Sequence, residues 1–245
     1  MITHRVFCVK FSSYHYHNHH QNVICSSSDD KTIRFWDFKY NKQLQLLNGH
    51  TSSVNGIEFS PFNGGRYLCS GSDDNTISLC DVETSKSLHV FNGHISNVWC
   101  IDISPLQSNN KDDNKMNSIG VIGGNGYAIC SGSYDQTIRI WDIETTKQFN
   151  VFKGHESVVM SVKYGLNGLL NTILSGADDF NVLFNGHKNT VLSVEYSPFV
   201  IKNISGNSNV ICSGSFDNAI RFWDIRSNKK ELYLIKGSND EDDII

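Results

Sequence analysis

The sequence has little that would place it in a membrane or outside the cell. It has 3 Pro in 245 residues, and no apolar run approaches the length of a membrane span. The first residues, Met1 to Arg5, lack the apolar core of a signal peptide. The formal net charge of −4 gives no general attraction to nucleic acids or anionic membranes. We therefore expect a protein of the cytoplasm, with the nucleus as the alternative, and a protein or peptide partner.

Catalytic and metal-binding motifs are absent as well. The chain has no C-x-x-C, G-x-S-x-G, H-E-x-x-H, phosphate-loop or dinucleotide-binding pattern. His155 and Glu156 are followed by Ser-Val-Val, which is not the spacing of a zinc protease. We therefore expect no enzyme, no cofactor and no metal site.

An internal repeat is the main feature that is present. A degraded copy of a 14-residue phrase begins at Ile173, and the full copies are Ile24–Asp37, Leu68–Asp81, Ile129–Asp142 and Ile211–Asp224. Each copy has two β-branched and aromatic runs around a turn of Gly, Ser, Asp and Asn, the pattern of a β-hairpin. A third run, such as Val54–Ser60, precedes each full hairpin, and a fourth, such as Leu88–Phe91, follows and leads into Gly-His. The repeat predicts units of four strands, a to d, which bury their faces against one another.

The spacing confines length variation to one connection. In units one to three, 24 residues separate the strand-b Ser from the next Gly-His histidine, as from Ser26 to His50. The interval from that His to the next strand-b Ser ranges from 20 to 37 residues, so the inserted residues lie between strands a and b. Because antiparallel strands alternate in direction, the a–b and c–d loops share one rim. The d–a and b–c loops share the other, which we call the constant rim.

Gly-His, an apolar run, Ser-Gly-Ser-x-Asp and Thr-Ile-Arg-x-Trp-Asp recur in this order and resemble the WD40 repeat family over residues 6 to 237. The resemblance implies an all-β fold, a WD40-type β-propeller of five repeats. The predicted units are about 1–48, 49–92, 93–153, 154–185 and 186–237, and an acidic tail follows at 238–245.

The resemblance also implies a structural hydrogen-bond network on the constant rim. The Gly-His imidazole meets the turn Asp and the strand-b Ser, and the strand-c Trp completes the chain of bonds. Unit one has Ile2 in place of the His, and unit two has Cys80 in place of the Trp. The expected members are Ser26, Asp30 and Trp36; His50, Ser70 and Asp74; His94, Ser131, Asp135 and Trp141; His155, Ser175 and Asp179; and His187, Ser213, Asp217 and Trp223.

Unit four departs from the repeat. Only 12 residues separate Ser175 from His187, so strand c is missing, while Asn181–Phe184 matches strand d. Without strand c the unit has an odd number of strands, so the chain would leave it at the rim opposite to the one where unit five begins. Residues 176–187 would then have to cross back to that rim. Two explanations remain: a three-stranded blade with an irregular crossover, or a 12-residue loss from the gene that keeps the reading frame.

The number of units is small for the family. WD40 rings usually have seven blades of about 40 residues each, more than 245 residues can supply. The sequence therefore predicts a closed five-blade ring or an open arc with bare apolar faces at both ends, and the family favours the arc. Such faces favour self-association through the end blades or a partner that carries further blades.

Two polar segments and the cysteines have simple interpretations. Histidines crowd the first a–b loop and could hold a divalent metal, but a polar low-complexity loop is the simpler interpretation; they are His15, His17, His19 and His20. Residues 107–118 are interpreted as a disordered loop. Six Cys fall in two repeat columns as small buried side chains of a reducing compartment: Cys25, Cys69, Cys130 and Cys212 in strand b, and Cys8 and Cys100 in strand a.

The family resemblance implies a non-enzymatic scaffold that displays a rigid rim to a partner. Residues just before the turn Asp often face that partner in the family, and Tyr134 and Phe216 are the preferred anchors because aromatic side chains dominate interface energies. Packing over the neighbouring turn is the alternative for both rings. The acidic residues at the same position are Asp29, Asp73 and Asp178.

Two other functions remain open. One is a partial or degenerate copy from a repeat-gene family without independent function. The other is a propeller enzyme that uses the central funnel, which would need convergent carboxylates or histidines in strand a, where only one column of mixed charge is available. We expect this column to form ion pairs between blades or around an axis. Its members are Lys10, Glu58, Asp102, Lys163 and Glu195.

Overall fold

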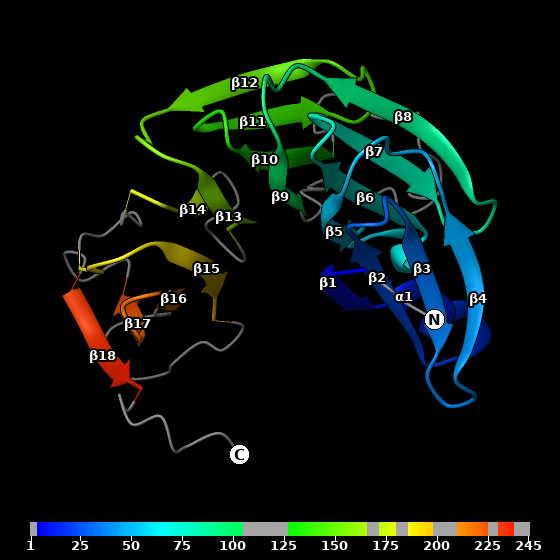
Figure 1. The fold of residues 1–245 in the computed structure, drawn as a ribbon, viewed down its shortest axis with the longest axis horizontal. Coiled ribbons are helices and arrows are strands. Elements are labelled where there is room, and N and C mark those ends of the chain that lie inside the picture. The colour runs from blue at the N-terminus through cyan, green and yellow to red at the C-terminus, as the bar shows by residue number, and fades with distance from the viewer. Residues whose placement is uncertain are drawn as a thin grey trace, which may run out of the picture.

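The computed structural model describes residues 4–104, 127–165, 172–179, 186–197, 210–224 and 230–237. Antiparallel sheets are arranged as blades around one axis, so the predicted all-β propeller is confirmed (Figure 1). Within each blade the strands pair in chain order, and the first strand lies nearest the axis.

The described strands form five sheets, which we number as blades 1 to 5 along the chain. Blade 1 contains β1 (Val6–Phe11), β2 (Val23–Ser28), β3 (Ile33–Asp37) and β4 (Lys42–Leu47). Blade 2 contains β5 (Val54–Phe59), β6 (Tyr67–Ser72), β7 (Thr76–Asp81) and β8 (Lys86–Asn92). Blade 3 contains β9 (Val98–Ile103), β10 (Ala128–Ser133), β11 (Thr137–Asp142) and β12 (Gln148–Lys153). In its described residues, blade 4 contains β13 (Val159–Tyr164) and β14 (Ile173–Ala177). Blade 5 contains β15 (Val191–Tyr196), β16 (Val210–Ser215), β17 (Ala219–Asp224) and β18 (Lys230–Lys236).

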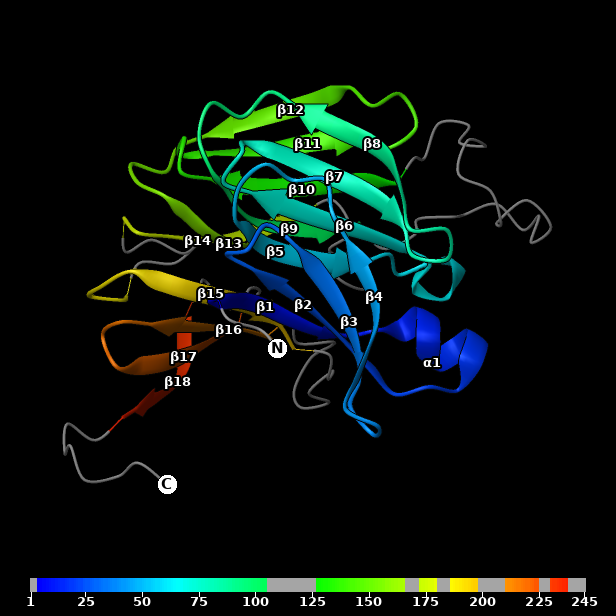
Figure 2. The same ribbon diagram turned by 45° about the vertical axis from the view of Figure 1, so that its right-hand side comes forward.

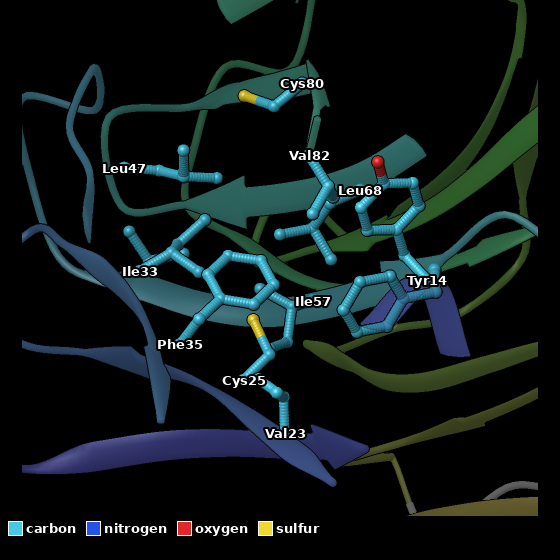
Figure 3. Close-up of a cluster of buried hydrophobic side chains, with 12 residues drawn as sticks. Tyr14, Val23, Cys25, Ile33, Phe35, Leu47, Ile57, Leu68, Cys80 and Val82 are labelled. Atoms are coloured by element: carbon cyan, nitrogen blue, oxygen red, sulfur yellow. The ribbon is translucent and has the colours of Figure 1, made fainter. Parts of the chain in front are cut away.

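The hydrophobic core lies between successive blades. In the first of these interfaces, Phe35 and Cys25 of blade 1 pack with Ile57 and Leu68 of blade 2, and all four are almost fully buried (Figure 3). Burying a side chain of this kind contributes roughly 1.5–3 kcal/mol. Because each blade depends on its neighbour for this burial, the repeat is stable only as a stack.

The blades form an incomplete ring that is open between blade 5 and blade 1 (Figure 1). This arrangement agrees with the incomplete or open ring that the sequence predicts. The open side exposes apolar side chains at both end blades, among them Phe11 of β1 and Ile235 of β18.

Blade 4 corrects one expectation about the path of the chain. Asp178 and Asp179, directly after β14, already lie at the constant rim: Asp179 hydrogen-bonds with His155, and Asp178 accepts a hydrogen bond from Thr190 of the loop before β15. No net crossing to the other rim is therefore needed, because the two strands β13 and β14 return the chain to the rim where blade 5 begins. The predicted strand at Asn181–Phe184 lies outside the described residues, as do residues 107–118 and the tail 238–245.

The His-rich a–b loop is a second correction, because residues Ser13–His19 form the helix α1 (Figure 2). Ser12 caps its N-terminus, and Tyr14 is buried in the interface between blades 1 and 2. The short 3-10 helix η1 (Asn63–Gly65) lies against α1. A Cβ at Gly65 would come within 1.9 Å of the Ser13 hydroxyl, so this close approach requires glycine. Among the described residues, neither helix is long or apolar enough to cross a bilayer.

Candidate functional site

Blade 3 shows the geometry of the constant-rim network in full. The His94 Nδ1–H donates to Asp135 at 2.7 Å, and the Ser131 hydroxyl donates to His94 Nε2 at 2.7 Å. Trp141 Nε1–H donates to the same Ser131 oxygen at 2.8 Å. The turn is closed by Thr137, whose hydroxyl donates to Asp135 at 2.6 Å. Each polar atom of this buried chain thus has a partner, which removes the cost of burying it.

The same network fixes the charge states. Burial alone would raise the pKa of Asp135, but the hydrogen bonds from Thr137 and His94 outweigh it and hold this pKa below its usual value. Burial lowers the pKa of His94, and the Asp135 carboxylate only partly offsets this effect. Near neutral pH the pair is therefore a carboxylate and a neutral imidazole.

The other blades repeat this arrangement with the losses that the sequence shows. In blades 2, 4 and 5 the His lies 2.8–3.0 Å from the turn Asp and 2.7–2.8 Å from the strand-b Ser; the residues are His50, Asp74 and Ser70; His155, Asp179 and Ser175; and His187, Asp217 and Ser213. Trp223 Nε1–H donates to Ser213 at 3.0 Å. In blade 2 the Ser78 hydroxyl lies 3.5 Å from the sulfur of Cys80, which stands in the Trp position.

In blade 1, an arginine makes the contact with the turn Asp that a histidine makes in the other blades. Trp36 Nε1–H donates to Ser26 at 3.1 Å, as in the complete blades. Arg34 donates to Asp30 at 2.7 Å, whereas the equivalent Arg139 and Arg221 lie 3.5 and 4.0 Å from their Asp. The Asp30 carboxylate therefore has Arg34 as a direct partner, a contact that the sequence analysis missed.

The five candidate partner-binding residues occupy one equivalent position on the constant rim. Their backbone N–H groups donate to carbonyls of the adjacent d–a loop or start of strand a; the residues are Asp29, Asp73, Tyr134, Asp178 and Phe216. Two of the carboxylates tie blades together. Asp29 accepts a hydrogen bond at 2.6 Å from Ser53 of blade 2, and Asp178 accepts one from Thr190 of blade 5. Asp73 accepts at 2.7 Å from Asn55 of its own blade.

The two aromatic candidates are exposed. Tyr134 is 42% and Phe216 61% exposed. The Tyr134 ring lies 5.6 Å from the ring of Trp99, and Trp99 lies 6.1 Å from Phe7 of blade 1. Phe7, Trp99 and Tyr134 thus form an aromatic row that joins blades 1 and 3 beside the axis.

Sequence analysis did not single out Phe7 or Trp99. Both occupy the second position of strand a, where the other blades have Asn55, Met160 and Leu192. A column of large side chains at the rim end of the innermost strands was the available signal. It gave no indication that Phe7 and Trp99 meet across blade 2.

The mixed-charge column forms ion pairs around the axis. Lys10 lies 2.7 Å from Glu58. Lys163 lies 3.6 Å from Glu58, 3.7 Å from Asp102 and 3.5 Å from Glu195, so one ammonium group links blades 2, 3, 4 and 5. Burial raises the pKa of Asp102 to about 6 despite the opposing effects of Lys163 and of a hydrogen bond from the Tyr164 backbone. These charges are engaged with one another.

Neither the cysteines nor the histidine-rich helix forms a site in the described residues. All seven Cys are free, and burial raises the pKa of the Cys25, Cys69 and Cys130 thiols. His15 is buried with its Nδ1 2.8 Å from Ser12, and no group of three or more His, Cys, Asp or Glu in the described ranges is placed to hold a metal.

The model of the WD40 family (WD domain, G-beta repeat) matches residues 1–37, 41–81, 85–142 and 180–224, which together make up more than half of the sequence. The chain belongs to the WD40 repeat family. No match covers residues 143–179, which include both described strands of blade 4. Propellers of this family typically mediate protein interactions.

Curated relatives share the repeat but are longer. Cell division control protein 4 of Saccharomyces cerevisiae is 29% identical over 154 residues, 59% of this chain and 19% of that protein. Guanine nucleotide-binding protein subunit beta-5b of Danio rerio is 31% identical over 208 residues, 82% of this chain and 47% of that protein. E3 ubiquitin-protein ligase COP1 of Arabidopsis thaliana is 25% identical over 113 residues, 44% of this chain and 17% of that protein. The chain thus spans less than half the length of these relatives.

Proposed function

We propose that this chain is a non-enzymatic scaffold that docks a partner protein or peptide on its constant rim. The aromatic row of Phe7, Trp99 and Tyr134 carries the proposal. Tyr134 is 42% and Phe7 37% exposed, and the rings come from two different blades, so a docked chain would bury them together. Aromatic side chains of this kind are enriched among the residues that dominate interface energies. Phe216, 61% exposed, extends the surface to blade 5.

The rigidity of this surface supports the same function. The candidate residues stand on turns whose Asp and His are locked by hydrogen bonds, as at Asp135 and His94. A partner therefore contacts side chains that are already held in place. Little of this surface has to become ordered on binding, which favours affinity.

The charged residues at the axis argue against the enzyme alternative. Catalysis in the funnel would need a carboxylate or imidazole free to act on a substrate. Lys10, Glu58, Asp102 and Lys163 instead neutralise one another in one cluster of ion pairs. With a net charge of −4, we expect neither nucleic acid nor membrane as the partner, and free buried thiols fit the cytoplasm or the nucleus.

The names of the relatives refer to cell division, ubiquitin ligation and a guanine nucleotide-binding protein, and so they support no single pathway. Self-association through the exposed end blades remains a further candidate interaction, separate from the rim surface. A degenerate copy without function remains the alternative, and it predicts that no stable protein accumulates in the native cells.

The test is capture of the tagged chain from native cells, followed by mass spectrometry. A stoichiometric partner should be lost from the double variants Trp99→Ala/Tyr134→Ala and Tyr134→Ala/Phe216→Ala. Phe149→Ala is the matched control, because Phe149 is 79% exposed on the outer strand β12 and should leave capture unchanged. Retention of every partner by both double variants would refute docking on the rim, and recovery of chaperones alone would favour the degenerate copy.

A further inference from the structure

The innermost strand of blade 1 exposes side chains that every other blade buries. Val9 and Phe11 of β1 are 55% and 75% exposed. The residues at the same positions in the later blades pack against the preceding blade and are at most 9% exposed; they are Ile57 and Phe59, Ile101 and Ile103, Val162 and Tyr164, and Val194 and Tyr196. Together with Val6, these two residues form what we call the leading face of blade 1. It has the composition of a blade interface, but it is exposed.

Blade 5 shows the reverse side of the same interface. Ile220 and Ile235 pair across β17 and β18 and are 45% and 55% exposed. The equivalent pair in blade 1 is Ile33 and Leu47, which blade 2 covers so that neither exceeds 5% exposure. We call Ile220 and Ile235 the trailing face of blade 5. The open side of the arc is therefore bounded by the two complementary halves of one interface type.

The narrow axis limits what fits between these faces. The Lys163 ammonium contacts carboxylates of blades 2, 3 and 5, so four blades already converge on one point. Propellers have four to eight blades, so five blades take up at least about 225° of a full turn. A second copy of this chain would need the same angle and would collide with the first when it continued the ring. A ring of six or seven blades leaves space for one or two more.

We infer that the open side of the arc docks a partner that supplies one or two four-stranded β-blades with two apolar faces. One face of the partner covers Val6, Val9 and Phe11, and the other covers Ile220 and Ile235. This inference goes beyond the rim surface of the proposed function and uses none of its aromatic residues.

Blades 2 and 3 of this chain, residues 49–153, provide the probe. If a second copy of this segment is joined directly ahead of Met1, five residues separate its Lys153 from Val6. The same number separates Lys153 from Val159 in the chain itself, so the added blades enter in the natural register. Amide hydrogen exchange of the extended chain should slow at least tenfold in β1 and in β17 relative to the original chain. The thermal midpoint should rise by roughly 5–10 °C, since several apolar side chains become buried.

Two substitutions sharpen the test. Phe11→Glu in the leading face should abolish the added protection of β1 but leave the unextended chain as stable as before, because Phe11 is exposed there. Phe149→Glu, on the outer strand β12 and on neither face, should leave the added protection intact. Unchanged exchange in β1 and β17 would overturn the inference. Sedimentation of the unextended chain as a stable dimer with β1 already protected would overturn it in favour of a second copy. Neither result involves Trp99 or Tyr134, so the rim proposal is tested separately.

Discussion

Blade 3 is described over its four strands and blade 4 over its two inner strands, a and b, and the two blades agree in these inner halves. The His–Asp and His–Ser distances are both 2.7 Å in blade 3 and both 2.8 Å in blade 4, although blade 4 has no network tryptophan. The innermost strands β9 and β13 also pack side by side at the axis. The hydrogen bonds of the rim therefore need only strands a and b and the d–a loop.

The outer half of a blade, strands c and d, contributes buried apolar side chains. In blade 2, Phe91 on the outer strand is covered by blade 3 and is 1% exposed. Its equivalent in blade 3, Phe152, faces blade 4, of which the structure describes β13 and β14, and is 46% exposed. The inner half thus sets the geometry of the ring, and the outer half supplies much of the apolar stabilisation.

The largest effect is expected from Trp141→Ala in blade 3. Trp141 is fully buried against Phe91 and donates to Ser131, so its removal leaves a cavity and should cost about 3–5 kcal/mol of unfolding free energy. Urea titration measures this loss. The control is Trp36→Ala in blade 1, where the ring is only partly buried and the loss should be smaller by at least about 1 kcal/mol. Equal losses at both positions would contradict the role assigned to the outer half.

A smaller effect should separate the two histidines. His94→Ala removes one hydrogen-bond partner from each of the buried residues Ser131 and Asp135 and should cost about 2–3 kcal/mol. His155→Ala in blade 4, where the imidazole is 16% exposed and water can replace it, should cost only about 1 kcal/mol. Urea unfolding of the two variants at pH 7.5 gives the comparison. If His155→Ala costs more than His94→Ala, solvent access does not control the strength of this network.

The axis gives a pH-dependent prediction. Burial raises the pKa of Asp102 from its ordinary value of 3.8 to about 6 in the folded chain, so ionised Asp102 opposes folding by up to about 3 kcal/mol at neutral pH. The penalty appears as the pH rises from about 4 through 6. Asp102→Asn should therefore stabilise the chain by about 1–2 kcal/mol more at pH 7.5 than at pH 5. The lost ion pair with Lys163 limits the gain.

The control for this prediction is Asp135→Asn at the rim, because the pKa of Asp135 is held below its usual value. Its carboxylate is ionised at both pH 5 and pH 7.5, so the effect of this substitution on the unfolding free energy should differ little between them. The rim carboxylates behave in the opposite way, because the pKa of Asp74, Asp135 and Asp217 is held below the usual value. Their stabilisation is present above pH 4 and is lost at lower pH. An Asp102→Asn effect that is independent of pH would contradict the burial of this carboxylate.

The sequence predicted those features that depend on the repeat. Strand order, hairpins and the residues of the rim network follow from fixed spacing, since each turn places its Asp next to the same Gly-His. The acidic and aromatic positions before the turn Asp were found in the same way. These features are local, or they join adjacent units.

Features that depend on folded proximity were not predicted. Phe7 and Trp99 are 92 positions apart and meet only because blades 1 and 3 curve around one axis. Helix α1 was missed because its polar sequence gives no apolar periodicity, while Tyr14 anchors it in the core. The position of the chain after β14 was not predicted, because the contacts of Asp178 with Thr190 and of Asp179 with His155 depend on how blades 4 and 5 meet.

The central claim is that the inner half of a blade, strands a and b, is enough to hold it in the ring. Amide hydrogen exchange of β13 and β14 tests this claim most directly. The slowest amides of β13 should approach the protection of β9 within about tenfold, because the rim hydrogen bonds and Lys163 hold both strands. Exchange of β13 at the rate of an exposed loop, while β9 stays protected, would show that a blade without its outer strands is not part of the rigid ring.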